Sequence, residues 1–306
     1  MITKSALVDL LERQGFRPHR SLGQNFLIDH NFLKFIVKTA QLAEKDVVLE
    51  IGPGPGLLTQ LLAQHARWVW AVEVDRKILE FAQSLCPELR NVRWIQDSIL
   101  DEHHTKLNPT VVNLITRELV NPSTRELVNP STRELVNSST RELKVISNLP
   151  YATSAAIILS LLESNLPIKS MVLMVQWEMA ERLTAPVGTK AYNALTILTN
   201  LLGAIKIIRK VPPGVFYPPP AVHSALITIT PRPNPLLSAH YALFKSFLQS
   251  VFRYRRKTIS RALKEATNWS TEEITERLNH SNISPKKRPE EITLSEWLKL
   301  FPRGKP

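Results

Sequence analysis

The sequence of 306 residues contains little cysteine, little glycine and no long hydrophobic run. Its single cysteine, Cys86, excludes an internal disulfide and favours a reducing compartment. No stretch is apolar enough to span a membrane, and residues 1–16 mix acidic and basic side chains without the apolar block of a signal peptide. We therefore expect a cytoplasmic protein that does not associate with membranes, and we expect it to be a monomer.

Acidic residues are fewer than basic ones. The chain has 39 Lys and Arg against 27 Asp and Glu, a net charge of +12, and residues 231–306 alone hold 15 basic and 7 acidic side chains. An excess of +8 in the last quarter of the chain suggests a polyanionic partner. A basic enzyme without such a partner fits the charge equally well.

The few glycines are clustered. Gly52, Gly54 and Gly56 directly follow the apolar run 47–51 and precede a helix-like stretch at 57–65. A buried strand, a glycine turn and a helix open an α/β unit, and strands and helices continue to alternate with short connections. This order predicts an α/β fold with a doubly wound, mostly parallel sheet, with strands at 47–51, 68–74, 92–96, 144–147, 170–175, 205–211 and 224–230 and helices at 57–65, 76–84, 154–163 and 177–183.

The pattern changes after the proline-rich run 231–235. From there on only helices are predicted, at 240–253, 259–265, 270–279 and 294–301. We therefore place a domain boundary here, between an α/β domain over 1–230 and a small all-helical domain over 231–306.

One segment interrupts the alternation. The octapeptide TRELVNPS begins at Thr116, repeats at Thr124, recurs as TRELVNSS at Thr132 and restarts as TREL at Thr140. A period of eight matches neither a helix nor a strand, and the Asn-Pro step interrupts a helix. We interpret residues 116–139 as a loop insertion rather than a binding array, because lengthening a loop changes stability little. Removing all three units would join Ile115 to Thr140.

The glycine turn differs from a dinucleotide fingerprint because Leu57 stands where the third glycine of G-x-G-x-x-G belongs. Glu73 ends the next strand, where a carboxylate can accept hydrogen bonds from ribose hydroxyls, and Asp97 ends the third, where it can meet an adenine amino group. A glycine turn and two acids at consecutive strand ends indicate a pocket for S-adenosylmethionine. No metal is expected in the site.

A tetrapeptide, Asn148-Leu149-Pro150-Tyr151, ends the strand at 144–147. An adenine amine is a poor nucleophile because its lone pair is delocalised into the ring. The Asn148 side-chain oxygen and the Leu149 carbonyl can accept hydrogen bonds from its N–H groups, which draws the nitrogen toward tetrahedral geometry. Tyr151 offers a face on which a flipped base stacks, and Pro150 stiffens the loop. Methyl transfer to a neutral amine needs alignment more than a strong base.

With these motifs in place, the chain resembles the bacterial small-subunit (16S) ribosomal RNA adenine dimethyltransferases over about 18–302, interrupted only by the repeats. The resemblance rests on SLGQNFL at 21–27, the glycine turn, the two acids, the tetrapeptide, FYPPPAVHS at 216–224 and RRKT at 255–258. It implies a Rossmann-like class I methyltransferase domain. It also implies that Gln24, Asn25, Leu27, Gly52, Gly54, Glu73, Asp97 and Asn148 bind the donor and that Phe216 joins Tyr151 in holding the adenine.

The resemblance further implies that small-subunit ribosomal RNA in pre-30S particles is the partner. The residues expected to bind RNA are basic and lie in the helical domain: Arg253, Arg255, Arg256 and Lys257. The chain departs from the family at Tyr192-Asn193-Ala194, which replaces Tyr-Gly-Arg and removes a basic RNA contact.

Three other functions remain open. A large-subunit ribosomal RNA adenine methyltransferase shares the donor and catalytic motifs but lacks the basic helical tail. A glutamine or DNA-adenine methyltransferase carries Pro where Leu149 stands. A non-catalytic ribosome-assembly factor can keep the fold, although the intact tetrapeptide and acids argue against it.

Overall fold

The computed structural model describes residues 25–120, 142–234 and 238–301, together with Ala6, Asp9, Leu10 and Arg13. Gln24, one of the residues expected to bind the donor, lies outside the described residues, as do residues 121–141 of the repeat segment.

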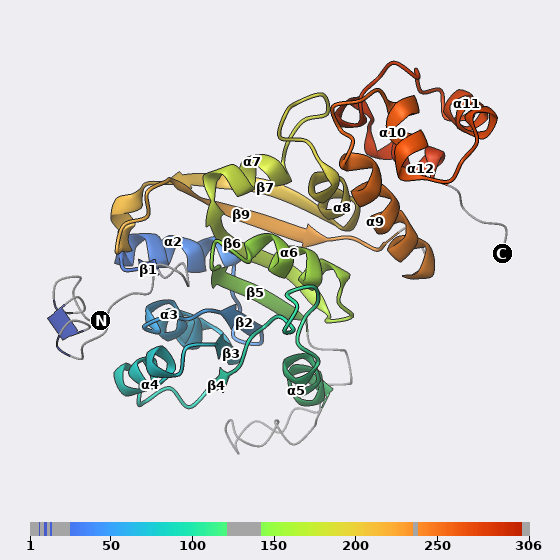
Figure 1. Ribbon diagram of the computed structural model, residues 1–306. Helices are drawn as coiled ribbons and strands as arrows, with labels where there is room; N and C mark the ends of the chain where they lie inside the picture. The colour runs from blue at the N-terminus through green and yellow to red at the C-terminus, as the bar shows by residue number, and fades with distance from the viewer. Residues whose placement is uncertain are drawn as a thin grey trace. The chain divides into compact units, whose positions relative to one another are not determined.

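Seven strands form one sheet in the order β4-β3-β2-β5-β6-β9-β7 (Figure 1). The pairs from β4 to β6 are parallel, and β9 runs antiparallel to β6. The order reverses between β2 and β5, which confirms the doubly wound, mostly parallel sheet. The strands span Val47–Ile51 (β2), Trp68–Glu73 (β3), Val92–Gln96 (β4), Leu143–Asn148 (β5), Ile168–Gln176 (β6), Gly203–Val211 (β7) and Ser224–Pro231 (β9).

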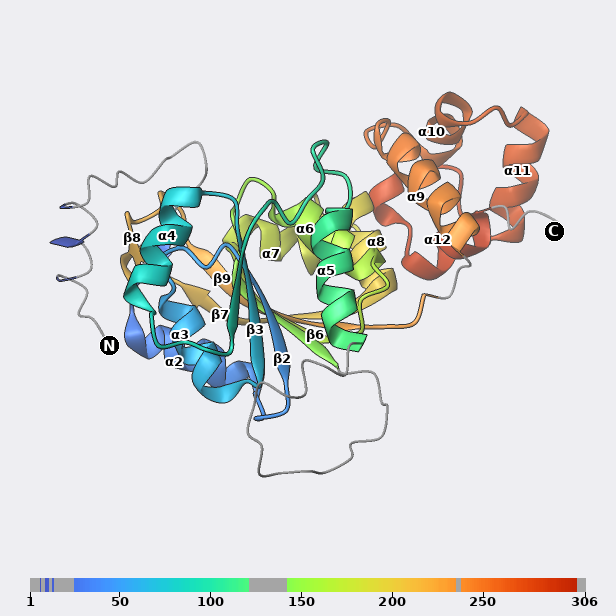
Figure 2. The same cartoon turned by 90° about the horizontal axis from the view of Figure 1, so that it is seen from below.

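Helices cover both faces of this sheet. Figure 2 shows α2, α3 and α4 on one face and α5 and α6 on the other. Each helix turns an apolar side toward the sheet, whose inner strands are buried throughout. The helices span His30–Ala40 (α2), Leu57–His65 (α3), Arg76–Leu85 (α4), Pro109–Val120 (α5) and Ser154–Glu163 (α6).

Two short elements lie beside the main sheet and were not predicted. β1 (Phe26–Leu27) pairs antiparallel with β8 (Phe216–Tyr217), bringing Leu27 opposite Phe216. Two-residue strands have no periodicity that a sequence pattern can reveal. Helix α2, also not predicted, follows β1; the Asp29 carboxylate caps it by accepting the Phe32 N–H at 2.8 Å.

The amino end of β5 is fastened by a buried cation. The Lys144 ammonium donates to the carbonyls of Ala40 (3.2 Å) and Gln41 (2.8 Å) at the end of α2 and lies 2.7 Å from the Asp46 carboxylate. Three oxygen partners offset the desolvation of the charge. This contact fixes the strand that carries Asn148 at its other end.

The repeat segment is not a loop from its first residue. Thr116–Val120 of the first unit lie in α5 (Pro109–Val120). At the other end, Glu142 of the last, partial unit pairs with Lys169 and Leu143 begins β5 as a fully buried residue. The leucine of the repeated tetrapeptide therefore lies in a helix in the first copy, as Leu119, and begins a strand in the last, as Leu143.

Because the repeat segment contributes residues to α5 at one end and to β5 at the other, the two ends predict how far the repeats can be shortened. Excising 124–139, two units, leaves one TREL for α5 and one for β5, so the free energy of unfolding should change by about 1 kcal/mol or less. Excising 116–139 leaves one copy for both elements and should lower it by roughly 2 kcal/mol more. Urea unfolding of both deletions measures this difference; equal stabilities would contradict it.

The described residues divide into two compact units, Met1–Trp177 with Lys206–Pro231, and Glu178–Ile205 with Arg232–Pro306. In the second unit the Tyr192 hydroxyl donates to the Ile292 carbonyl (3.0 Å) and the Gly188 N–H to the Glu290 carbonyl (2.8 Å). These bonds attach residues 178–205, which the sequence assigned to the α/β domain, to the C-terminal helices. The division at 230/231 remains a prediction about domains.

The second unit is built around aromatic side chains. Phe244 and Phe301 lie 5.2 Å apart between ring centroids, Phe247 and Trp297 5.9 Å apart, and Trp297 is fully buried. Its helices span Ala194–Leu202 (α8), Ser238–Phe252 (α9), Ile259–Ala266 (α10), Thr271–His280 (α11) and Leu294–Leu300 (α12), with residues 178–183 of α7 (Trp177–Leu183). No helix of the described residues is long and apolar enough to cross a membrane.

Candidate functional site

The glycine turn after β2 requires glycine for two reasons. Gly52, Gly54 and Gly56 all adopt positive φ angles of 68°, 54° and 82°, which side chains disfavour. In addition, a Cβ atom on Gly54 would lie 2.8 Å from the Phe26 ring. The turn therefore exposes bare backbone and packs tightly against β1.

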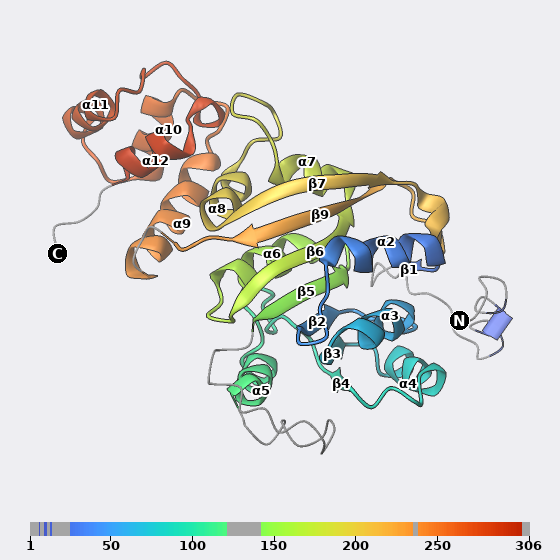
Figure 3. The ribbon, with the colours of Figure 1, turned by 180° about the vertical axis from the view of Figure 1, so that it is seen from behind.

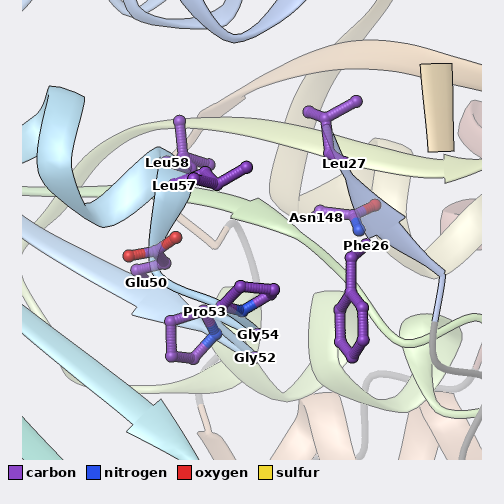
Figure 4. Close-up of a pocket in the computed structure, with 10 residues that line it drawn as sticks. Phe26, Leu27, Glu50, Gly52, Pro53, Gly54, Leu57, Leu58 and Asn148 are labelled. Carbon is purple, nitrogen blue, oxygen red and sulfur yellow. The ribbon is translucent and has the colours of Figure 1, made fainter. Parts of the chain in front are cut away.

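A small pocket opens at this turn (Figure 4). It brings together Leu27, Gly52, Gly54 and Asn148, four residues expected at the donor site, from β1, the glycine turn and the end of β5. The sequence interpretation missed the remaining lining residues, which are Phe26, Glu50, Pro53, Pro55, Leu57 and Leu58.

The two predicted acids lie at neighbouring strand ends. The Glu73 carboxylate accepts the N–H groups of Gly54 (3.4 Å) and Asp75 (3.0 Å), so it is tied to the glycine turn. Burial raises the pKa of Glu73, opposed by those N–H groups. The Asp97 N–H donates to the Glu73 carbonyl (3.1 Å), and the Asp97 carboxylate accepts from the Asn108 amide (2.9 Å). Both carboxylates are thus held in fixed orientations.

Val74 follows Glu73 directly and was also missed. Val74 is 60% exposed, an apolar residue in solvent between Glu73 and Asp75 in the chain. Such a side chain offers a surface for the flat face of an aromatic ligand. A hydrophobic residue immediately after a strand-ending acid is the signal that could have found it.

Glu50 is the least expected member of the site. It is 1% exposed, and its Oε2 atom has no hydrogen-bond partner among the described residues. Burial raises the pKa of Glu50 to about 8, and the nearby Glu73 carboxylate acts in the same direction. Glu50 was not identified from the sequence because it lies within an apolar run that predicts a buried strand.

Asn148 is oriented by its own amide. Its Nδ2 donates to the Asn25 carbonyl at 2.9 Å, which fixes the amide orientation. Its Oδ1 is buried and has no partner among the described residues. A buried acceptor without a donor is unfavourable by about 1–3 kcal/mol, and a ligand N–H group can relieve this. The N–H group of the next residue, Leu149, donates to the Met174 carbonyl (3.1 Å).

The two predicted stacking residues differ in exposure. Tyr151 is half-buried; its hydroxyl lies 2.6 Å from the Ser224 hydroxyl, and burial raises its pKa. Phe216 is 1% exposed and belongs to the core, so it presents no ring face to a ligand. Stacking by Phe216 stays a prediction, and it requires the ring to leave its packed position.

The four predicted RNA-binding residues lie between α9 and α10. Arg255 donates to the Lys190 carbonyl (2.7 Å) and lies 3.9 Å from Glu290, and Lys257 pairs with Glu265 (2.8 Å). Arg253 and Arg256 are exposed, with no side-chain partner within the described part of the chain. Arg253 and Arg256 are therefore the two with unengaged side chains, and RNA binding by all four residues stays a prediction.

Comparison with known proteins places these features in a family. A family model described as ribosomal RNA adenine dimethylase matches residues 15–303. The Ribosomal RNA small subunit methyltransferase A of Natranaerobius thermophilus is 32% identical over 95% of this chain and 93% of its own length. That of Alkaliphilus oremlandii is 35% identical over 94% and 92%.

Solved structures show the same fold. A dimethyladenosine transferase from Plasmodium falciparum aligns with a TM-score of 0.65 at 22% identity, covering 90% of this chain and 95% of that one. The 23S rRNA methyltransferase ErmE aligns at 0.62 with 23% identity over 90% and 98%. The family match spans the glycine turn, the acids and the Asn148 tetrapeptide as well as the helical tail. The chain belongs to the ribosomal RNA adenine dimethylase family.

Proposed function

We propose that this enzyme transfers methyl groups from S-adenosylmethionine to the exocyclic amines of adjacent adenines in small-subunit (16S) ribosomal RNA, producing dimethyladenosine. It acts in the cytoplasm as a monomer on immature 30S particles. The observation that carries the proposal is the Asn148 Oδ1 atom, a buried acceptor without a donor, at the rim of a pocket formed by the glycine turn.

The residues that line the pocket, together with Glu73, Val74 and Asp97 outside its lining, suit the donor. Bare backbone at Gly52 and Gly54 admits a ligand close to the strand end, the Glu73 carboxylate can accept from ribose hydroxyls, and Asp97 can accept from an adenine amine. Val74 supplies an apolar surface next to Glu73. When bound, the donor supplies an electrophilic methyl group and a neutral leaving thioether.

Asn148 prepares the nucleophile. Its Oδ1 accepts a hydrogen bond from the adenine amine while Nδ2 still donates to the Asn25 carbonyl, so the acceptor keeps its direction. An accepted hydrogen bond draws the amine toward tetrahedral geometry and frees its lone pair. Tyr151, anchored by Ser224, holds the base beside it.

Two of the three alternatives, the large-subunit enzyme and the non-catalytic assembly factor, have less support than the small-subunit enzyme. The likeness to the 23S enzyme lies below 25% identity and concerns the fold, whereas relatives named as small-subunit enzymes reach 35%. A non-catalytic assembly factor has no use for the unpartnered Asn148 oxygen.

Mass spectrometry tests the proposal. The protein is incubated with donor and small-subunit particles from cells that lack this modification, and in parallel with large-subunit particles. Dimethyladenosine in small-subunit RNA is expected. Transfer to large-subunit RNA alone, or to neither, would overturn the proposal.

The neighbouring arginines of the helical domain give a matched pair of variants. Arg256→Ala should remove a phosphate contact and flatten the dependence of log Kd on log salt by about 0.9. Arg255→Ala should leave that slope unchanged and lower the thermal stability instead, since Arg255 is bound to Lys190 and Glu290. Filter binding over a salt series measures the slope; equal slopes for the two variants would contradict the assignment.

A further inference from the structure

β7 carries three exposed cations along the outer strand of the sheet. It is last in the strand order, and Figure 3 shows it beside β9 at the sheet margin. Lys206, Arg209 and Lys210 are exposed, as is Ile208, while Gly203 and Val211 at the two ends are buried. Charge is thus concentrated in the middle and carboxyl-terminal part of the strand.

None of these three cations is neutralised within the described residues, where no ion pair involves them. Arg209 instead lies over the Phe35 ring, 5.3 Å from its centroid, and Lys210 over the Trp177 ring at 4.7 Å. An aromatic ring holds a cation in place without cancelling its charge. Because successive strand residues point to opposite faces, positive charge is presented on both sides of the edge.

The charged end of β7 is connected to the catalytic loop by a short series of contacts. Trp177, under Lys210, donates its N–H to the His223 carbonyl at 3.0 Å. The next residue, Ser224, contacts the Tyr151 hydroxyl at 2.6 Å. Lys210 therefore lies at the end of the sheet that carries the catalytic loop, and Arg209 and Lys206 precede it along the same strand.

We propose that Lys206, Arg209 and Lys210, the edge stripe, bind phosphates of the substrate RNA that flank the target adenine. The inference rests on the proposed function and adds a second RNA-binding surface, on the methyltransferase unit itself. Edge strands also carry lysine simply to prevent pairing with another chain. That role requires no contact with RNA, so the salt dependence of RNA binding distinguishes the two.

The test uses the full chain with all three residues changed to glutamine: Lys206→Gln, Arg209→Gln and Lys210→Gln. Glutamine removes the charge and keeps part of the side-chain stem. With unmodified small-subunit particles as the probe, log Kd against log salt should flatten by about 2–3 units, at about 0.9 per contact. The affinity at 0.1 M salt should fall on the order of tenfold or more, and calorimetry should show unchanged donor binding.

A control comes from the amino-terminal ends of the parallel strands, the end of the sheet opposite the Asn148 loop. Lys45 and Arg90 are exposed and stand just before β2 and β4, at the amino ends of the parallel strands. Lys45→Gln with Arg90→Gln should leave the slope unchanged. A second control keeps the positive charges but changes the side chains: Lys206→Arg, Arg209→Lys and Lys210→Arg. This variant should retain the wild-type salt dependence of Kd, which separates loss of charge from loss of folding.

The outcomes are distinct. If the glutamine variant of the edge stripe kept the wild-type slope of log Kd against log salt, the proposal that the stripe binds phosphates would be wrong. It would also be wrong if the control variant lost as much of that slope, because the effect would then be due to net charge alone. A wild-type chain that neither binds nor methylates small-subunit particles would overturn the proposed function, which is a different result from normal wild-type activity with an unaffected variant.

Discussion

Asn148→Ala is expected to slow methyl transfer by about 10²-fold or more, equivalent to a loss of about 3 kcal/mol of transition-state stabilisation. The Oδ1 atom is buried and unpartnered, so its acceptor capacity is available to the substrate amine. Its hydrogen bond strengthens as the amine becomes tetrahedral, which is why the loss should appear in the rate of the chemical step. Single-turnover methylation of small-subunit particles measures that rate.

Glu73→Ala is the control, because it is expected to weaken donor binding rather than to slow the chemical step. Glu73 is tied to the glycine turn through the Gly54 N–H and is expected to hold the donor. Its removal should raise the donor dissociation constant, measured by calorimetry, with a smaller effect on the single-turnover rate at saturating donor. Asn148→Ala should affect donor binding less. An Asn148→Ala variant with the wild-type single-turnover rate would contradict the assignment and favour a non-catalytic assembly factor.

The sequence predicted most of the central sheet because those strands are apolar runs bounded by turn residues. β2 at Val47–Ile51, α3 at Leu57–His65 and α6 at Ser154–Glu163 match their predicted bounds. α8 was missed, although Asn193 caps it with a hydrogen bond to the Leu195 N–H at 2.9 Å.

The candidate site was predictable where residue type and strand end coincide, as for Gly52, Glu73 and Asn148. The parts of the site that depend on which side chains are buried or engaged in the folded chain could not be predicted from the sequence. Phe216 carries the expected motif, yet pairing of β8 with β1 buries its ring. The two adjacent arginines, Arg255 and Arg256, look alike in sequence, and only tertiary contacts separate the one that is bound from the one that is free.

Glu50→Gln is expected to change the pH dependence of stability. The pKa of Glu50 rises from 4.5 to about 8 on folding, so the folded chain retains a proton that the unfolded chain releases. The stabilisation is fully present below pH 4.5 and is lost as the pH rises through 8. A shift of three and a half pH units at about 1.36 kcal/mol each sets an upper limit of about 5 kcal/mol.

Urea unfolding of wild type and Glu50→Gln at pH 5.5 and pH 8.5 isolates this contribution, because all other titrating groups are common to both proteins. The variant should be the more stable of the two at pH 8.5 by several kcal/mol, and the gap should narrow at pH 5.5. A gap that is the same at both values would show that Glu50 titrates normally in the folded chain.

A buried carboxyl that destabilises the protein near neutral pH is unfavourable for folding alone, whereas amide or apolar side chains would fit the same strand without that loss. Glu50 lines the pocket, so its ionised form can interact favourably with a cationic ligand there. Glu50→Gln should therefore be more stable yet bind the positively charged donor more weakly, and the difference in affinity should grow from pH 6 to pH 8. Calorimetry with donor across that range measures this change, and tighter or pH-independent binding by the variant would assign Glu50 a purely structural role.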